Sequence, residues 1–258
     1  MEIIQAAILA LVQGITEWLP VSSSAHLLIA QSLLGAEVPV SFDVVLHIGT
    51  LAAVAAVFWR DILGIASAVV RLRRADPLFK VGMMIILGSI PTAAIGYLVS
   101  TAEASLLSLT SVGCALVLTS IILFASRAGR GTGTVGAKHA LLVGAVQGIA
   151  VIPGISRSGS TISAALLAGV GRDEAFRYSM LLSIPAILGA TMLKAGEIAQ
   201  SGLGAEMLLG MVIAAVVGYA SIRALRRTMT SGRFHLFGAY CLVAGLAVVA
   251  YSLIWAGA

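Results

Sequence analysis

Two short polar segments interrupt an otherwise apolar chain, and their residues are of the kinds that handle phosphate. The first segment runs from Gln13 to His26 and contains Glu17 and three consecutive serines. The second runs from Pro153 to Thr161 and supplies a guanidinium, four hydroxyls and two glycines. A hydroxyl beside an imidazole and a carboxylate can form an activated nucleophile, while arginine and backbone N–H groups bind phosphate oxygens. Together the segments predict phosphoryl chemistry.

The first segment does not decide which group is the nucleophile. Ser23 and His26 are three residues apart, a helical spacing that could bring an imidazole within reach of a hydroxyl. Ser23 could attack phosphorus while His26 takes its proton. His26 could instead attack, or activate water, with Ser23 only a phosphate ligand. The structural alternative is that the serines cap a helix and the histidine is an ordinary core residue.

The presence of Glu17 argues against a purely structural role for the first segment. An ionisable group at membrane depth costs about 2.5–3.5 kcal/mol on insertion scales and by default indicates function. Its partner is expected to be Arg157 or a metal ion, for which Glu17, with Gln13 as a second candidate, would be the ligand. A purely structural pair of Glu17 and Arg157 is the alternative. The expected catalytic residues are Glu17, Ser23, His26 and Arg157. The expected substrate ligands are Gln13, Ser22, Ser24, Gly154, Ser156, Ser158 and Thr161.

The composition places these segments in a membrane protein. Of 258 residues, 59% are hydrophobic and 10% charged, with a mean hydropathy of +1.05. The net charge of +5 comes without a basic arm, so nucleic acid is not an expected partner. Cys114 and Cys241 lie in apolar segments and indicate neither a disulfide framework nor a thiolate metal site. Apolar stretches long enough to cross a bilayer predict an all-α polytopic fold. Six spanning helices are expected near residues 42–59, 81–100, 105–126, 175–194, 203–222 and 236–256.

Residues 1–36 and 138–171 are apolar at both ends and broken in the middle, which favours re-entrant helical hairpins. A shift of 134 positions aligns the Val-Gln-Gly-Ile sequence starting at Val12 with the one starting at Val146. We therefore expect one membrane domain, 1–258, with repeats at 1–127 and 138–258. Each repeat holds one hairpin and three spans, so the repeats have inverted topology and place the site near the bilayer midplane.

The loop charges predict the orientation. Basic residues follow the first, third and fifth spans: Arg60, Arg71, Arg73, Arg74, Lys80, Arg127, Arg130, Lys138, Arg223, Arg226, Arg227 and Arg233. The opposite loops carry Glu37, Glu103, Glu197 and Glu206. By the positive-inside rule, both termini lie outside the cell membrane, and the hairpin tips meet in the middle.

The polar segments resemble the signature motifs of the undecaprenyl-diphosphatase family, also called the bacitracin-resistance family. The first motif has Glu or Gln followed four residues later by Glu, here Gln13 and Glu17, and then Pro-Val-Ser-Ser and a histidine, here His26. The second is Pro-Gly-x-Ser-Arg-Ser-x-x-Thr, matched throughout by 153–161. The stretches 42–50 and 182–186 also resemble sequences of this family, so the resemblance covers nearly the whole chain. Gln13 departs from members that carry a second glutamate.

The resemblance implies hydrolysis of a C55 isoprenoid diphosphate to the monophosphate, which recycles the carrier lipid of cell-wall synthesis. It also implies a divalent cation, Mg²⁺ or Ca²⁺, and a site open to the outer face. A second copy of the chain, in a homodimer, is a further expected partner. The alternative function is a transporter or flippase for a phosphorylated polyprenyl lipid, because inverted repeats suit alternating access. A carrier has no need for Ser23 beside His26, and a purely structural subunit has no need for either polar segment.

Overall fold

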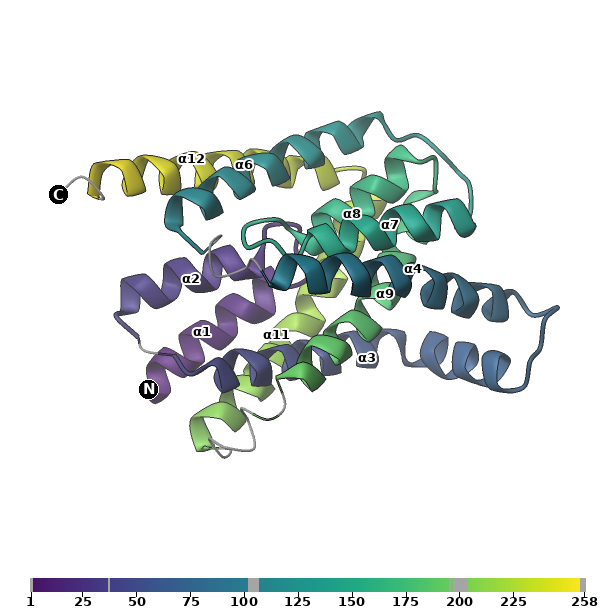
Figure 1. Ribbon diagram of the computed structural model, residues 1–258, viewed down its shortest axis with the longest axis horizontal. Coiled ribbons are helices and arrows are strands. Elements are labelled where there is room, and N and C mark those ends of the chain that lie inside the picture. Colours follow the sequence, from purple (N-terminus) through teal and green to yellow (C-terminus); the bar gives the residue numbers. More distant parts are fainter. Residues whose placement is uncertain (1, 37, 102–106, 195, 197–203, 256–258) are drawn as a thin grey trace.

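The computed structural model describes residues 2–36, 38–101, 107–194, 196 and 204–255, which form helices and turns (Figure 1). The first half of the chain contains α1 (Ile3–Thr16), α2 (Ser23–Leu34), α3 (Val40–Val70), α4 (Pro77–Ser100), α6 (Leu109–Ala125) and the short η1 (Ser126–Ala128). The second half contains α7 (Ala137–Ile149), α8 (Arg157–Leu167), α9 (Arg172–Leu193), α11 (Ala205–Thr230), η2 (Phe234–Leu236) and α12 (Phe237–Trp255). The all-α prediction is confirmed.

Six of these helices are long and apolar enough to cross a membrane: α3, α4, α6 with η1, α9, α11 and α12. This number and their order match the sequence prediction. The predicted starts at 105 and 203 and the predicted end at 256 lie outside the described residues. The first span was predicted to end at residue 59, but α3 continues to Val70 beyond a non-helical backbone conformation at Phe58. Likewise α11 continues to Thr230, past the predicted end at 222.

The two broken segments each form a pair of short helices. Helices α1 and α2 have 14 and 12 residues, and α7 and α8 have 13 and 11. At a rise of about 1.5 Å per residue, none of the four is as long as a bilayer core of roughly 30 Å. Each pair is followed by three long helices, so the two halves present their elements in the same order.

The halves are interleaved by helix contacts. Helix α1 of the first half packs on α11 of the second, while α7 of the second half packs on α4 of the first, and α6 pairs with α12. The glycines of the repeated Val-Gln-Gly-Ile sequence lie at the first two contacts. A Cβ on Gly14 would lie 2.8 Å from Val217 Cβ, and a Cβ on Gly148 would lie 2.8 Å from Ile95 Cβ. The repeated glycines therefore permit equivalent close approaches.

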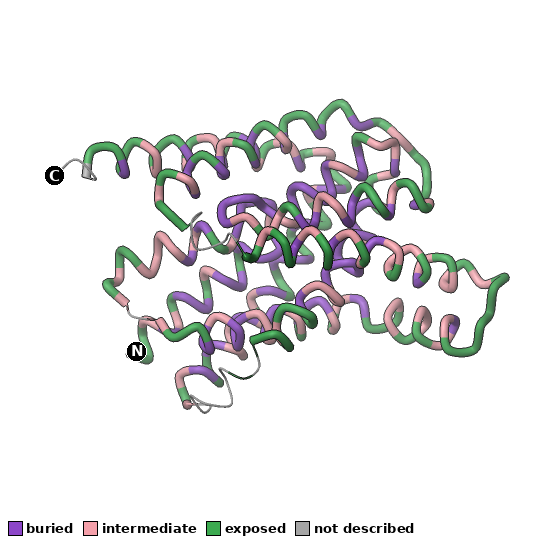
Figure 2. Tube along the Cα trace, in the orientation of Figure 1, coloured by how far each residue is buried: buried purple, intermediate pink, exposed green. Residues whose placement is uncertain are grey.

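Buried residues concentrate where the two helix pairs meet, and exposed residues lie on the outside (Figure 2). Many of the exposed residues are large and apolar. Trp18, in the turn after α1, is fully buried in the largest apolar cluster. Leu98, Val243 and Ile254 are each about 70% exposed, as expected for side chains that face lipid rather than water. The polar turns thus lie inside the helical assembly, and its outer surface is apolar.

Helices α1 and α12 reach the same end of the molecule. Figure 1 shows the start of α1 and the end of α12 at this end and the basic α3–α4 connection at the opposite end. Three of the acidic residues that indicated the opposite loops, Glu37, Glu103 and Glu197, lie outside the described residues. The described arrangement separates the termini from the basic residues Arg71, Arg73 and Arg74.

Candidate active site

Two buried turns form the site, and each ends where a helix begins. Helix α1 ends at Thr16, and Glu17 is its C-cap, after which the chain turns through Pro20 to Ser22 and enters α2. Ser22 has a left-handed backbone with φ of 69°, an uncommon conformation for serine that places Ser23 at the first position of α2. A non-glycine residue in this conformation is often part of a functional turn.

The second turn connects α7 to α8 and depends on Gly154. This residue has φ of 96°, and a Cβ there would lie 2.6 Å from the Val112 carbonyl oxygen of α6. A side chain at this position would be strained both by its backbone conformation and by the neighbouring helix. The turn then reaches Ser156, whose hydroxyl caps α8 by accepting a hydrogen bond from Gly159 N–H at 3.1 Å. Arg157 is the first residue of α8.

Hydrogen bonds join the two turns. The Gly154 N–H donates to Ser24 Oγ at 3.3 Å, and the Ser158 hydroxyl donates to the Leu19 carbonyl at 3.2 Å. Thr119 of α6 accepts from Ser156 N–H at 3.1 Å and donates to the Gly154 carbonyl at 3.1 Å. Residues some 140 positions apart in the sequence are therefore held against one another, as the sequence analysis predicted for the two polar segments.

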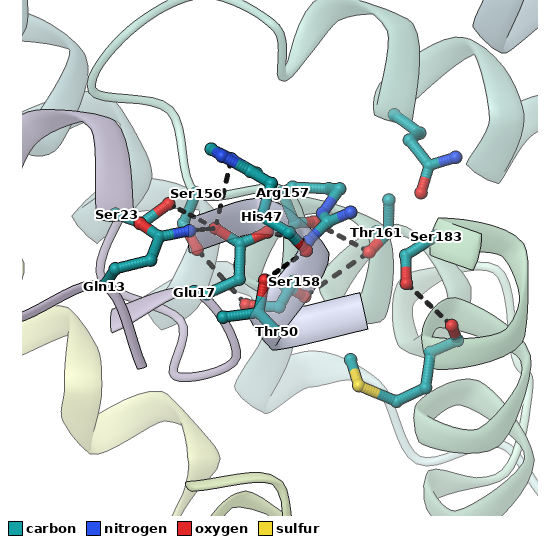
Figure 3. Close-up of polar contacts among 12 residues, drawn as sticks. Gln13, Glu17, Ser23, His47, Thr50, Ser156, Arg157, Ser158, Thr161 and Ser183 are labelled. Carbon is teal, nitrogen blue, oxygen red and sulfur yellow. Dashed lines mark hydrogen bonds and ion pairs between the residues drawn. The ribbon is translucent and has the colours of Figure 1, made fainter. Parts of the chain in front are cut away.

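Glu17 is the centre of the site (Figure 3). Its Oε1 forms an ion pair with the Arg157 guanidinium. Its Oε2 accepts hydrogen bonds from Gln13 Nε2 at 3.0 Å and from the Ser23 hydroxyl at 2.6 Å. Because the Glu17 side chain is only 5% exposed, these groups take the place of water around the carboxylate.

His47 of α3 is a third group beside Glu17 Oε2. It was not among the predicted site residues. Its Nε2 lies 3.8 Å from Glu17 Oε2, and its Nδ1–H donates to the Asp43 carbonyl at 2.8 Å. The Asp43 side chain in turn accepts a hydrogen bond from Gln31 of α2. The sequence signal was the four-residue spacing of Asp43 and His47 at the start of an apolar span, but spacing alone does not show which side chain a histidine faces.

Electrostatics keep the Glu17 carboxyl ionised. Glu17 lies outside the six spanning helices, and burial alone would raise its pKa. The Arg157 guanidinium, His47 and the hydrogen bonds from Ser23 and Gln13 together lower the pKa below its ordinary value. The Arg157 Cζ also lies 5.4 Å from the centroid of the Trp18 ring, a cation–π contact that holds the guanidinium in place.

The predicted hydrogen bond between Ser23 and His26 is not formed. The Ser23 hydroxyl donates to Glu17, while His26 Nδ1–H donates to the Ser22 carbonyl at 2.7 Å. Its Nε2 then accepts from the Tyr240 hydroxyl of α12 at 2.7 Å, and the two rings stack. Ser23 and His26 share one helix, but the hydroxyl is hydrogen bonded to Glu17 and the imidazole to Tyr240. The nearest base to the Ser23 hydroxyl is therefore a carboxylate.

The remaining expected phosphate ligands differ in how their hydroxyls are engaged. Ser22 and Ser24 hydrogen bond to each other at 3.1 Å, and Ser156 and Ser158 are 3.4 Å apart. Thr161 is fully buried, donating to the Arg157 carbonyl at 2.7 Å and pairing with the Ser179 hydroxyl at 2.6 Å. Its contacts connect α8 to α9. Thr161 thus supports the arginine-bearing helix.

The oxygens of Glu17 and Gln13 suit a divalent cation whose remaining ligands come from the substrate and water. No group of three or more His, Cys, Asp or Glu side chains that could hold a metal occurs in the described part of the chain. However, Gln13 Oε1 is buried beside Glu17 and has no hydrogen-bond partner. Magnesium is commonly bound by one or two protein oxygens, waters and substrate phosphates rather than by a complete protein cage. Glu17 and Gln13 Oε1 fit that pattern.

These features define a class: a polytopic helical membrane protein with a buried carboxylate–arginine–serine site suited to a phosphorylated ligand. The model of the family "Bacitracin resistance protein BacA" matches residues 6–247, and the chain belongs to this family. An undecaprenyl-diphosphatase from Desulforapulum autotrophicum is 42% identical over 95% of this chain and 97% of that protein. Those from Methanosphaera stadtmanae and Korarchaeum cryptofilum are each 39% identical, over 98% and 96% of this chain and 99% of each relative.

Proposed function

We propose that this chain is a membrane phosphatase that hydrolyses undecaprenyl diphosphate to undecaprenyl phosphate and inorganic phosphate, thereby recycling the carrier lipid of cell-wall synthesis. Relatives that bear the name undecaprenyl-diphosphatase match the chain from end to end at about 40% identity. The observation that carries the proposal is the contact of both turns through Glu17, which binds Arg157 on one oxygen and the Ser23 hydroxyl on the other.

The diphosphate binds between the starts of α2 and α8. Both helices begin at the two turns that meet there, and the N-cap residue of α2, Ser22, makes no side-chain cap hydrogen bond, whereas Ser156 caps α8. The positive end of a helix dipole and free N–H groups favour an anion. Arg157 adds a formal positive charge at the start of α8. Ser22, Ser24, Ser156, Ser158 and the Gly154 backbone surround the same space and provide the remaining polar contacts.

Ser23 is the proposed nucleophile. As its oxygen bonds to the terminal phosphorus, the bond from that phosphorus to the bridging oxygen breaks and undecaprenyl phosphate leaves. The hydroxyl proton passes to Glu17 Oε2, which already accepts it at 2.6 Å. Water then attacks the phosphoserine, releases inorganic phosphate and restores the serine. Arg157 stabilises the charge on the transferring group, which is the main requirement in phosphoryl transfer.

His26 provides an alternative nucleophile or base. In the present arrangement its Nε2 accepts from Tyr240, so His26 would have to leave this partner before it could attack phosphorus or activate water. Phosphoserine trapped by acid quench in wild type, and absent from Ser23→Ala, would support the serine mechanism. Phosphohistidine is labile in acid and has to be trapped by alkaline quench, and its presence in wild type and loss in His26→Ala would support the alternative.

A divalent cation, Mg²⁺ or Ca²⁺, is the proposed cofactor. Glu17 and Gln13 Oε1 are the protein oxygens that would hold it. When bound, the ion supplies positive charge that offsets the charge of the diphosphate.

We also propose that the helix pairs α1–α2 and α7–α8 are re-entrant hairpins in an inverted-topology repeat. The reciprocal packing of α1 on α11 and of α7 on α4 supports equivalence of the halves. With the basic connections inside, the termini and the opening of the site would face outward. The single domain with repeats at 1–127 and 138–258, and the homodimer, stay predictions.

Phosphate release from undecaprenyl diphosphate by protein purified in detergent, with and without EDTA, tests the function. Ser23→Ala and Arg157→Ala are each expected to lower kcat by about 100-fold or more, the usual cost of losing a nucleophile or an electrostatic stabiliser. Ser100→Ala and Arg223→Ala, at exposed positions of α4 and α11, are the matched controls. No release by folded wild type that still binds the lipid would contradict the phosphatase and favour a lipid transporter.

A further inference from the structure

A small cavity lies among the ends of α6, α8, α9 and α11, on the side of the molecule that the loop charges predict to be cytoplasmic. It has a volume of about 30 Å³, and the residues that line it include Arg127, Gly129, Leu166, Arg172, Gly232 and Phe234. One ordered water needs roughly 10–15 Å³. The cavity is therefore large enough for a small ionic group but not for a whole lipid.

Two arginines from separate segments border this cavity. Arg127 belongs to η1, after α6, and Arg172 is the first residue of α9. Within the described part of the chain, neither guanidinium forms an ion pair or a side-chain hydrogen bond. Asp173 and Glu174 follow Arg172 along α9, but no carboxylate is among the described residues that line the cavity. Two cationic groups thus border one space without a protein anion between them.

Two glycines keep the cavity open and bring its walls together. Gly232, in the turn after α11, has φ of 71°, and a Cβ there would lie 2.8 Å from Arg172 Nη1. The guanidinium therefore lies against the backbone of this turn, where a larger residue would displace it. Gly129 follows η1, and a Cβ there would lie 2.6 Å from the Leu166 carbonyl oxygen near the end of α8. The walls meet through backbone, and no side chain at either position fills the space.

The general charge of the loops does not explain this convergence. The positive-inside rule requires basic residues on one side of the membrane but not at a common point. Arg71, Arg73 and Arg74 satisfy the rule as exposed residues of one short connection. Arg127 and Arg172 instead come from different connections to the same cavity. Helix α9 also begins there without a side-chain cap, so the positive end of its dipole adds to the field of the two guanidiniums.

We propose that this cavity is a second phosphate-binding site, in which Arg127 and Arg172 hold the oxygens of one phosphate group. Guanidinium groups bind phosphate through paired, charge-assisted hydrogen bonds. Basic pockets between membrane helices on the cytoplasmic side bind the head groups of anionic lipids. The exposed side chains of Leu167 and Leu236 are next to lining residues and offer apolar surface to the acyl chains of such a lipid. Inorganic phosphate offers the same oxygens without the chains.

The inference goes beyond the proposed function, because no step of the hydrolysis takes place in this cavity. Arg157 of the proposed active site and Leu166 of the cavity lie at opposite ends of α8, roughly 14 Å apart along the helix axis. A ligand that binds only the folded protein raises its unfolding temperature. Occupation of the second site can therefore be measured without an assay of activity.

The test titrates two probes into the full chain purified in detergent and follows the unfolding temperature: inorganic phosphate at an ionic strength held constant with chloride, and phosphatidylglycerol with phosphatidylcholine as its reference. The variant Arg127→Gln/Arg172→Gln is expected to need at least about tenfold more probe than wild type for the same rise. Arg71→Gln/Arg73→Gln removes the same charge from the same side and should respond as wild type does. Phosphate bound at Arg157 contributes to all three proteins and does not affect the comparison.

A response to phosphatidylglycerol that only Arg127→Gln/Arg172→Gln loses would support the site and identify a lipid head group as its ligand. The same loss with inorganic phosphate alone would support the site and identify free phosphate. Equal responses of the two double variants to both probes would overturn the proposal, because Arg127 and Arg172 would then contribute no more than net charge. Should the double variant not fold, Arg172→Gln alone is held to the same outcomes, with Arg71→Gln as its control.

Discussion

Glu17 both neutralises a buried cation and accepts the proton of the proposed nucleophile. These two roles can be separated by substitution. Glu17→Gln leaves the Arg157 charge without its counter-charge in a largely buried position, whereas Ser23→Ala removes only a neutral hydroxyl. Losing one member of a buried ion pair costs on the order of 3 kcal/mol, much more than losing one neutral hydrogen bond.

We therefore expect Glu17→Gln to lose activity and also to unfold at a clearly lower temperature in detergent, while Ser23→Ala loses activity with nearly unchanged thermal stability. The double variant Glu17→Gln with Arg157→Met should recover much of the lost stability, because no unpaired charge remains. If Glu17→Gln unfolds at the wild-type temperature, the ion pair does not hold the two turns together.

His47 is expected to contribute, after Arg157, to the pH at which Glu17 becomes a base. His47 lowers the pKa of the Glu17 carboxyl, so His47→Ala should raise it. Since the ionised carboxylate accepts the Ser23 proton, activity is lost as pH falls through this pKa. The acid limb of kcat/KM should therefore move to higher pH in His47→Ala, while His235→Ala, in the distant η2, leaves the limb in place. An unmoved limb in His47→Ala would remove His47 from the proton-handling group.

Among the individual residues, the sequence predicted a cationic partner for Glu17, either Arg157 or a metal ion, because an isolated charge at membrane depth requires a counter-charge. It did not predict that Ser23 would face Glu17 instead of His26. Helical spacing tells which side chains share a helix, but the left-handed turn at Ser22 sets how α2 is rotated relative to α1. Tyr240 was missed and His47 was considered only as indirect support for the site, because their contacts depend on how α12 and α3 pack around the hairpin.

At the scale of elements, hydropathy located all six long helices because a bilayer requires apolar segments of a minimum length. It placed the ends of α3 and α11 too early. Helix α11 continues through charged and polar residues beyond the apolar window, while α3 continues past Arg60 and Asp61 into a second, mostly apolar segment that ends at Val70. Packing of particular helix pairs followed only from the structure.

The tightest of these contacts joins α4 and α7 and gives an element-scale prediction. A Cβ on Gly144 of α7 would lie 2.0 Å from the Gly88 carbonyl oxygen of α4, so Gly144→Ala must push the helices apart. We expect a loss of about 1–3 kcal/mol in the free energy of unfolding, the usual cost of overpacking. Gly189→Ala is the control, because nothing lies within 4 Å of a Cβ there. It should be neutral or slightly stabilising in its helix.

A displaced α7 would also move α8 and Arg157. Gly144→Ala is therefore expected to lower kcat along with stability, although Gly144 itself does not belong to the site. Normal kcat in a destabilised Gly144→Ala protein would show that the position of α8 is fixed by its contacts with α6 and α9 rather than by α7.

At the scale of the whole molecule, the topology makes a prediction that depends on whether the first helix pair is re-entrant. If residues 1–36 turn back, only α3 crosses between Glu2 and Arg74, and these two residues lie on opposite sides of the membrane. If residues 1–36 crossed the bilayer once, two crossings would separate Glu2 from Arg74 and both would face the same side. One pair of accessibility measurements therefore tests both the hairpin and the orientation.

The measurement uses single cysteines at Glu2 and Arg74 in a protein whose Cys114 and Cys241 are replaced by alanine. With the basic residues inside, Glu2→Cys should react with a membrane-impermeant maleimide in intact cells, and Arg74→Cys only after permeabilisation. Labelling of both from outside, or of neither, would exclude the re-entrant hairpin, and the reverse pattern would keep the hairpin but invert the protein. Only the expected pattern opens the proposed site to lipid in the outer leaflet.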